Sequence, residues 1–179
     1  MARSIPARPT YPRPMPTPAA IVAKPESPEW FALPDPEHGR DGTGLRFGCT
    51  MCGNCCSGPE GYVLLSDAEI AALARRLRMS VEKFVEEHTH MTPEGRSLRE
   101  KKSAKGLDCT FLDREKIPGK AVCGVYEDRP AQCRTWPFWE SVVKTRAAWE
   151  RAKRVCPGID TGKKYDLVQI RVARETVKI

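Results

Sequence analysis

Half of the eight cysteines of this chain lie within eight consecutive residues, and this local group of thiols restricts the possible folds more than any other feature. Residues 49–56 follow the pattern C-x2-C-x2-C-C, with Cys49, Cys52, Cys55 and Cys56. Cysteines separated by two residues can bend around one metal centre, because a tight turn directs both sulfur atoms inward. Gly53 tolerates the positive φ that such a turn requires. The pattern therefore predicts a chain that folds around a metal or a metal cluster.

The other four cysteines follow singly at wide spacing: Cys109, Cys123, Cys133 and Cys156. A local group of thiols combined with distant single thiols is expected of a fold that closes around its metal. The side chains of adjacent Cys55 and Cys56 point apart in extended backbone, so they do not easily reach the same ion. Eight thiols suffice for two four-cysteine sites, or for one site with four spare or bridging sulfurs. The sequence leaves both arrangements open.

Length and composition favour one small domain with an appendage. The 179 residues are 40% hydrophobic and 30% charged, so metal ligation is expected to supplement a thin core. No run of about 18 apolar residues occurs, and hence no membrane span is expected. The N-terminus is rich in proline, unlike a secretory signal peptide. We expect a cytoplasmic protein, where thiols stay reduced and metal binding is favoured over disulfides.

The chain is basic, with a formal net charge of +7. Its lysines and arginines are scattered among carboxylates, as on an ordinary solvated surface, so the sequence carries no specific nucleic-acid signal. A centre held by four thiolates is itself anionic, and some excess positive charge is expected near it. The net charge therefore identifies no binding partner other than the metal. The sequence does not identify a protein partner.

Proline dominates the N-terminal segment. Residues 1–36 contain ten of the sixteen prolines, and proline removes backbone donors and blocks helices. We therefore expect a disordered tail over residues 1–36 and a metal-binding domain over residues 37–179. Trp30 and Phe31 are the residues that would attach the end of the tail to the domain.

The remainder of the chain predicts a mixture of short helices and short strands. Ser66 and Glu69 form a capping box for a helix that ends near Arg78, and Ser80 caps a second helix that ends near His88. Further helices are expected after an Asp128 cap and over residues 145–154 and 167–177. Strands are expected at residues 45–47, 61–65, 109–112 and 121–126, whereas residues 91–106 read mainly as loop with an edge strand near Leu98. The predicted fold class is a small, cysteine-rich α+β domain stabilised by a metal or cluster.

The later cysteines stand in short motifs of their own. In order, these motifs are Cys109-x-Phe111-Leu112, Cys123-x-Val125-Tyr126-x2-Arg129-Pro130-x2-Cys133-Arg134-x-Trp136-Pro137 and Cys156-Pro157-Gly158. Together with the first group they cover roughly residues 45–160 and resemble the YkgJ-type cysteine-cluster family, a zinc- or iron-chelating domain family named for its CxxCxxCC signature. A compound pattern of this length is very specific, whereas a single C-x2-C would not be.

The resemblance implies a domain that binds a metal or a cluster, usually without an assigned reaction. One relative is the flagellin lysine N-methylase, a larger protein for which an iron–sulfur cluster has been proposed in methyl transfer. The alternative function is therefore a cluster-assisted methyl or group transferase that acts on a protein lysine. The sequence contains no radical-SAM spacing, P-loop or HExxH motif, so no catalytic residue is predicted. Tyr126 is expected to pack in the core.

The spacing of the cysteines favours iron over zinc. Structural zinc sites usually have two separated C-x2-C pairs, whereas here one compact group is followed by single cysteines. We therefore expect an iron–sulfur cluster of the [4Fe–4S] type, with zinc as the alternative. Arg129 and Arg134 flank Cys133 and are expected to bind cluster sulfide or an anion. Their alternative role is a salt bridge to Glu127 or Asp128.

Overall fold

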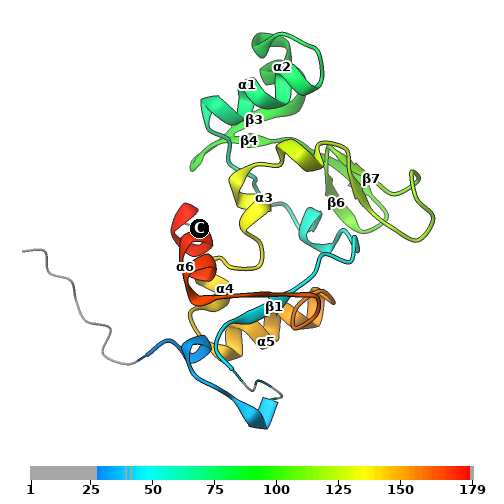
Figure 1. Cartoon of the computed structure of the whole chain (residues 1–179). Helices are drawn as coiled ribbons and strands as arrows, with labels where there is room; N and C mark the ends of the chain where they lie inside the picture. The colour runs from blue at the N-terminus through cyan, green and yellow to red at the C-terminus, as the bar shows by residue number, and fades with distance from the viewer. Residues whose placement is uncertain (1–27, 39, 41, 178–179) are drawn as a thin grey trace, which may run out of the picture.

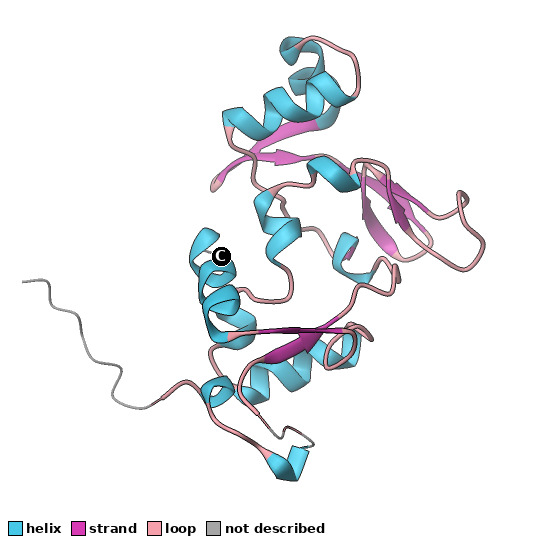
Figure 2. Cartoon of the chain, in the orientation of Figure 1, coloured by secondary structure: helices cyan, strands magenta, loops and turns pink. Residues whose placement is uncertain are grey.

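Short helices and short antiparallel strands alternate along the chain, which confirms the predicted α+β class (Figure 2). The computed structural model describes residues 28–38, 40 and 42–177 (Figure 1). The part of the predicted tail over residues 1–27 lies outside this range, so its disorder stays a prediction. None of the helices in the described ranges is both long and apolar enough to span a membrane.

The elements are short throughout the described residues. The α-helices are α1 (Asp67–Arg76), α2 (Val81–His88), α3 (Ala131–Thr135), α4 (Glu140–Val143), α5 (Arg146–Val155) and α6 (Leu167–Thr176). The 3-10 helices are η1 (Trp30–Ala32), η2 (Pro36–His38), η3 (Asn54–Cys56) and η4 (Tyr126–Asp128). The strands are β1 (Leu45–Phe47), β2 (Ser57–Gly58), β3 (Thr89–Thr92), β4 (Gly95–Leu98), β5 (Glu100–Ser103), β6 (Gly106–Cys109), β7 (Leu112–Asp113), β8 (Val122–Cys123) and β9 (Lys163–Tyr165). They pair in the orders β1–β9, β2–β6–β5, β3–β4 and β7–β8, all antiparallel.

The buried apolar side chains form two clusters, one in each half of the molecule. The α1–α2 core consists of Ile70, Leu73, Ala74, Phe84, Leu98 and Val125. The α5–α6 core consists of Phe31, Leu45, Phe138, Val142, Val143, Trp149, Cys156, Ile159 and Ile170. In Figure 1, α3 and the chain that follows β1 run between the two halves. The segment that carries most of the cysteine motifs therefore lies between two small cores.

The predicted helix caps at Ser66 and Ser80 are confirmed. The Ser66 hydroxyl accepts a hydrogen bond from the Glu69 amide, and the Glu69 carboxylate accepts one from the Ser66 amide, so the capping box is complete. The Ser80 hydroxyl likewise accepts from the Lys83 amide at the start of α2. Thr145 caps α5 in the same way. These caps satisfy backbone donors that the first helical turn leaves free.

The predicted cap at Asp128 is wrong. Asp128 ends η4, and α3 begins only at Ala131 with Pro130 at its N-cap and no side-chain cap. The proline explains the difference, because the residue before a proline is driven out of the helical region, and Arg129 indeed has a ψ of 137°. The Asp128 carboxylate forms an ion pair with Arg76 of α1 instead.

Two strand predictions also need correction. Residues 61–65 lie beside β4 but form only a single bridge with it, between Leu64 and Ser97, because side chains bind two of the backbone amides. Backbone hydrogen bonds to β4 remain on either side of the bridge, from the Leu65 amide to the Arg96 carbonyl and from the Leu98 amide to the Val63 carbonyl. The Ser97 hydroxyl accepts from the Val63 amide at 2.9 Å, and the Gln132 side chain accepts from the Leu64 amide at 3.0 Å. Residues 91–106, predicted to be mainly loop, instead take part in the two hairpins β3–β4 and β5–β6.

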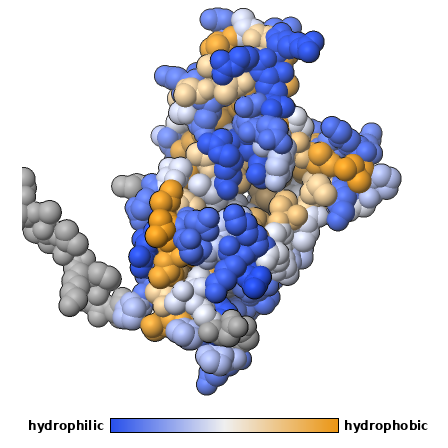
Figure 3. Space-filling view, in the orientation of Figure 1, coloured by the Kyte–Doolittle hydropathy of each residue, from blue (hydrophilic) through white to orange (hydrophobic). Residues whose placement is uncertain are grey.

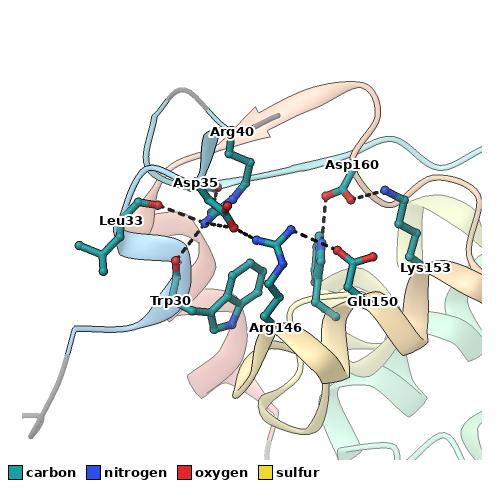
Figure 4. Close-up of polar contacts among 10 residues, drawn as sticks. Trp30, Leu33, Asp35, Arg40, Arg146, Glu150, Lys153 and Asp160 are labelled. Carbon is teal, nitrogen blue, oxygen red and sulfur yellow. Dashed lines mark hydrogen bonds and ion pairs between the residues drawn. The ribbon is translucent and has the colours of Figure 1, made fainter. Parts of the chain in front are cut away.

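The N-terminal described residues are tied to the α5–α6 core, as predicted for Trp30 and Phe31. Phe31 is only 1% exposed, and the Trp30 indole donates a hydrogen bond to the Val143 carbonyl at 2.7 Å. Arg40 donates to the Trp30 carbonyl at 3.0 Å. The Asp35 carboxylate forms ion pairs with Arg40 and with Arg146 of α5 (Figure 4). The predicted boundary at residue 37 thus falls inside a segment that packs on the domain.

Replacing Phe31 with alanine is expected to lower the free energy of unfolding by about 3–5 kcal/mol, because it empties a fully buried aromatic site. Urea unfolding of the purified protein measures the change. Leu33→Ala is the matched control, since Leu33 is 47% exposed and lies two residues away. Equal losses in the two variants would contradict the assignment of Phe31 to the core.

Candidate metal centre

The turn through the first cysteine group depends on one glycine. Gly53 has a φ of 75°, and a Cβ atom there would lie 2.5 Å from the Ala121 side chain. The Cys56 amide donates to the Gly53 carbonyl at 2.9 Å, and the Ala121 amide donates to the Met51 carbonyl at 2.7 Å. The predicted tight turn is therefore present, and it is fastened to the chain just before β8.

A buried ion pair supports the far end of this turn. Arg114 donates to both oxygens of Asp108, at 2.9 and 3.1 Å, and to the Ser57 hydroxyl at 2.5 Å. The Ser57 hydroxyl in turn donates to the Gly53 carbonyl at 3.0 Å. Asp108 is 2% exposed, and the hydrogen bonds from Arg114 hold the pKa of its carboxyl well below the usual range. The pair thereby fixes Ser57 directly after the vicinal cysteines.

The first of two cavities between the halves is surrounded by thiols. It has a volume of about 320 Å³ and is lined by six cysteines: Cys49, Cys55, Cys56, Cys109, Cys123 and Cys133. Much of the remaining wall is apolar, with side chains such as Leu98, Phe111 and Leu112. The space-filling view shows a hollow where the two halves meet (Figure 3). The fold therefore gathers thiols from separate parts of the sequence around one space.

Burial raises the pKa of several thiols in this wall. It raises the pKa of Cys109 to about 11 and, with help from the neighbouring Cys109, Cys55 and Cys123, that of Cys133 to about 12. The pKa of Cys123 is raised for the same reason. Cys109, Cys123 and Cys133 thus give up their protons readily only when a positive charge such as a metal ion replaces them.

The second cavity shares three cysteines with the first. Its volume is about 410 Å³, and its cysteines are Cys49, Cys52, Cys55, Cys133 and Cys156. Every predicted ligand cysteine therefore lines at least one of the two cavities. Cys156 contributes from the C-terminal end of α5, where its sulfur accepts a hydrogen bond from the Trp136 indole at 3.4 Å.

The vicinal cysteines differ in their surroundings. Cys55 lines both cavities, whereas Cys56 lines the first. Residues 54–56 form the 3-10 helix η3 and not extended backbone, and the two sulfur atoms are 3.7 Å apart, so the expectation that the side chains point apart is wrong. A hydrogen bond from the Cys56 thiol lowers the pKa of Cys55 to about 7. The same interaction, together with burial, raises the pKa of Cys56. The pair thus favours one thiolate beside one thiol.

The donor set fits a thiophilic metal. Eight free thiols are present, and thiolates select zinc, copper(I) and iron–sulfur clusters over hard cations such as calcium. Within the described residues, no three His, Cys, Asp or Glu side chains are placed to hold a single metal ion. The thiols surround the cavities without meeting at one point, and which of them bind metal stays a prediction.

The two predicted arginines both reach the cavities. Arg129 lines both, and Arg134 lines the second. Arg129 donates to the Tyr126 carbonyl at 3.1 Å and stacks over the Tyr126 ring at 3.8 Å, while Arg134 donates to the Arg129 carbonyl. The alternative salt bridge to Asp128 is taken by Arg76. Tyr126 is 47% exposed and lines the cavities, so the prediction that it packs in the core is wrong.

Sequence reasoning missed several residues of the second cavity. Lys163 and Tyr165 reach it because β9 pairs with β1, next to the first cysteine group. Thr50 lines it from between Cys49 and Met51. A pairing between strands so far apart in sequence leaves no local signal, and the run Lys163-Lys164-Tyr165 shows no alternation of polar and apolar residues that could have suggested a strand.

Comparison with known families supports a metal-binding role. A family model matches residues 48–157, which make up more than half of the chain and include all eight cysteines. The chain belongs to the CxxCxxCC family. Its description is "putative zinc- or iron-chelating domain", and the resemblance seen in the sequence is thereby confirmed. No solved structure matches the chain.

The Asp108–Arg114 pair gives a pH-dependent prediction. Folding lowers the pKa of Asp108. The ion pair therefore contributes fully to the free energy of unfolding above the ordinary aspartate pKa of about 3.9, and this contribution is lost as the pH falls below that value. Asp108→Asn is expected to lower the free energy of unfolding by about 1–3 kcal/mol at pH 7, and by less in acid. Denaturant unfolding at several pH values measures this. Glu115→Gln, an exposed neighbour, is the control, and an equal loss at all pH values would contradict the argument.

The vicinal pair gives a second prediction. Cys55 lines the second cavity together with Cys52, so Cys55→Ala is expected to reduce metal content as far as Cys52→Ala does. Cys56→Ala is expected to differ, either by emptying a second site or by sparing the metal. Metal stoichiometry and absorption spectra of the three variants, measured side by side, decide this. Indistinguishable losses in the Cys55 and Cys56 variants would mean that the pair acts as one ligand unit.

Proposed function

We propose that this chain is a cytoplasmic metal-binding protein whose cysteines hold an iron–sulfur cluster of the [4Fe–4S] type. The observation that carries the proposal is the first cavity, where six thiols from separate segments surround about 320 Å³. A single ion bound by four thiolates needs little space beyond its ligands, whereas a cluster occupies a cavity and takes its thiolates from several directions.

The surroundings of the thiols support the same proposal. The wall of the first cavity combines the cysteines with apolar side chains and a single arginine, Arg129. A cluster with four thiolate ligands carries net negative charge, and hydrogen bonds or cations near its sulfurs stabilise it. Arg129 and Arg134 are the residues that we expect to supply this stabilisation.

Zinc is the alternative metal, and one distance favours it. Two thiolates on a tetrahedral zinc lie about 3.8 Å apart when each Zn–S bond is about 2.3 Å. The sulfur atoms of Cys55 and Cys56 are 3.7 Å apart, so this pair matches the edge of a zinc site. A zinc site would then use two neighbouring residues for one ion and leave several thiols free.

A cluster-assisted methyl or group transferase is the alternative function. The second cavity favours it in one respect, since it adjoins the thiols and could admit a substrate. Its charges argue against lysine as that substrate, because Arg129, Arg134 and Lys163 in its wall would repel a protonated amine. A lysine methylase would need to receive its substrate through the first cavity.

The test is metal and sulfide analysis of the full chain purified without oxygen. The proposal expects iron and acid-labile sulfide in equal amounts, near four of each per chain, with visible absorption that bleaches on reduction. Stoichiometric zinc without sulfide would support the alternative metal. A chain that contains neither metal after purification and reconstitution would overturn the assignment to metal binding.

Removal of the metal is expected to disrupt the tertiary structure, because the thiols lie between the two cores. Chelation under reducing conditions should abolish much of the near-UV circular dichroism, to which Trp136 beside Cys156 contributes. Restoring the metal should recover it. If the stripped protein keeps a cooperative transition at the same temperature, the metal is peripheral to the fold.

A further inference from the structure

The second cavity has a basic wall. Arg129, Arg134 and Lys163 line it, and no Asp or Glu is among its lining residues in the described part of the chain. Within those residues the three cations also form no ion pair with a carboxylate. Arg129 and Arg134 donate to backbone carbonyls, and Lys163 lies 5.3 Å from the Tyr165 ring centre. The Arg134 charge helps to lower the pKa of Glu69, although the two side chains form no ion pair. The charges of Arg129 and Lys163 are thus the more available to a ligand.

One hydroxyl in the same wall has no partner. The Thr50 Oγ1 atom is buried and forms no hydrogen bond with any described residue, although Thr50 lines the second cavity. A buried hydroxyl without a partner costs free energy, and it is usually satisfied by water or by a ligand. Because the hydroxyl itself is shielded from solvent, the Thr50 side chain would have to rotate to donate a hydrogen bond to an anionic oxygen that the three cations attract.

Besides the cysteines, aromatic side chains form much of the remaining wall. Phe47, Tyr126, Trp136, Phe138 and Tyr165 contribute to it. The Tyr126 ring is already covered by the Arg129 guanidinium, which shows how a flat group can stack in this region. Aromatic walls favour flat rings through offset or edge contacts, beyond the area that they bury. A volume of about 410 Å³ is within the range of small-molecule sites.

We infer that the second cavity binds a small organic anion, a carboxylate or phosphate ester that carries an aromatic ring. The anionic group would lie among Arg129, Arg134, Lys163 and the Thr50 hydroxyl, and the ring would contact the aromatic wall. The inference rests on the proposed function, because five cysteines of the metal centre complete the cavity. The second cavity would then bind an organic anion beside the metal centre.

The test is a set of matched probes titrated into the metal-loaded full chain. Benzoate and phenyl phosphate supply ring and charge, acetate and inorganic phosphate supply charge alone, and benzamide supplies the ring alone. Isothermal titration or ligand-observed NMR measures binding, and metal content is determined on every sample. At least one ring-bearing anion is expected to bind about tenfold more tightly than both its ring-free counterpart and benzamide.

Single substitutions locate the binding. Lys163→Gln is expected to weaken the bound probe about tenfold, and Thr50→Val by a smaller factor, with metal content unchanged. Arg129→Gln is expected to weaken the probe about tenfold as well, and its metal content is compared separately because Arg129 also adjoins the proposed cluster. Arg151→Gln on the exposed surface of α5 is the control for loss of one positive charge. Lys163→Gln remains decisive if Arg129→Gln loses metal, because Lys163 lies on β9, outside the cysteine motifs.

Two results would overturn the inference. In the first, metal is present but the ring-bearing anions bind no better than acetate, phosphate or benzamide. In the second, they bind but Lys163→Gln has no more effect than Arg151→Gln. A chain without metal that still binds the ring-bearing anions through Lys163 would instead refute the proposed function and leave the anion site standing.

Discussion

The thiols between the two cores are the constraint on which the rest of the structure depends. Cys109 and Cys123 pack against the α1–α2 core, whereas Cys156 is buried within the α5–α6 core. Each core is small, and a small core alone stabilises a chain only marginally. A metal or cluster held by thiols from both sides would link the cores more firmly than their own contacts do. Folding and metal binding are therefore expected to be one process in this family member.

Features that depend on neighbouring residues could be predicted from the sequence. The capping box of Ser66 and Glu69 and the turn at Gly53 involve residues at most three positions apart, so their physical causes are visible in the chain itself. The cysteine pattern was similarly sufficient for the family. The attachment of Trp30 and Phe31 could also be predicted, because two large apolar side chains at the end of a proline-rich segment are expected to pack on the domain, as Phe31 does.

Features that depend on distant partners could not be predicted in this way. The amides of Val63 and Leu64 bond to the side chains of Ser97 and Gln132, so an apolar run that resembles a strand pairs with β4 through a single bridge only. Lys163 enters the second cavity only because β9 pairs with β1. Tyr126 has the size of a core residue, but it lies beside a cavity and is half exposed. In each case a contact across the fold overrides the local preference.

The wall shared by the two cavities connects the proposed metal centre with the proposed anion site. Arg129 lines both cavities, and Cys49, Cys55 and Cys133 also belong to both. A thiolate-bound centre is anionic and attracts the same guanidinium that an anionic ligand would use. If the centre is an iron–sulfur cluster, each added electron would raise the electrostatic cost of an anion in the second cavity. A bound anion would make reduction harder by the same free energy, because the coupling is reciprocal. The shared wall would then make ligand affinity and redox state parts of one equilibrium, with Arg129 as the residue through which their charges interact.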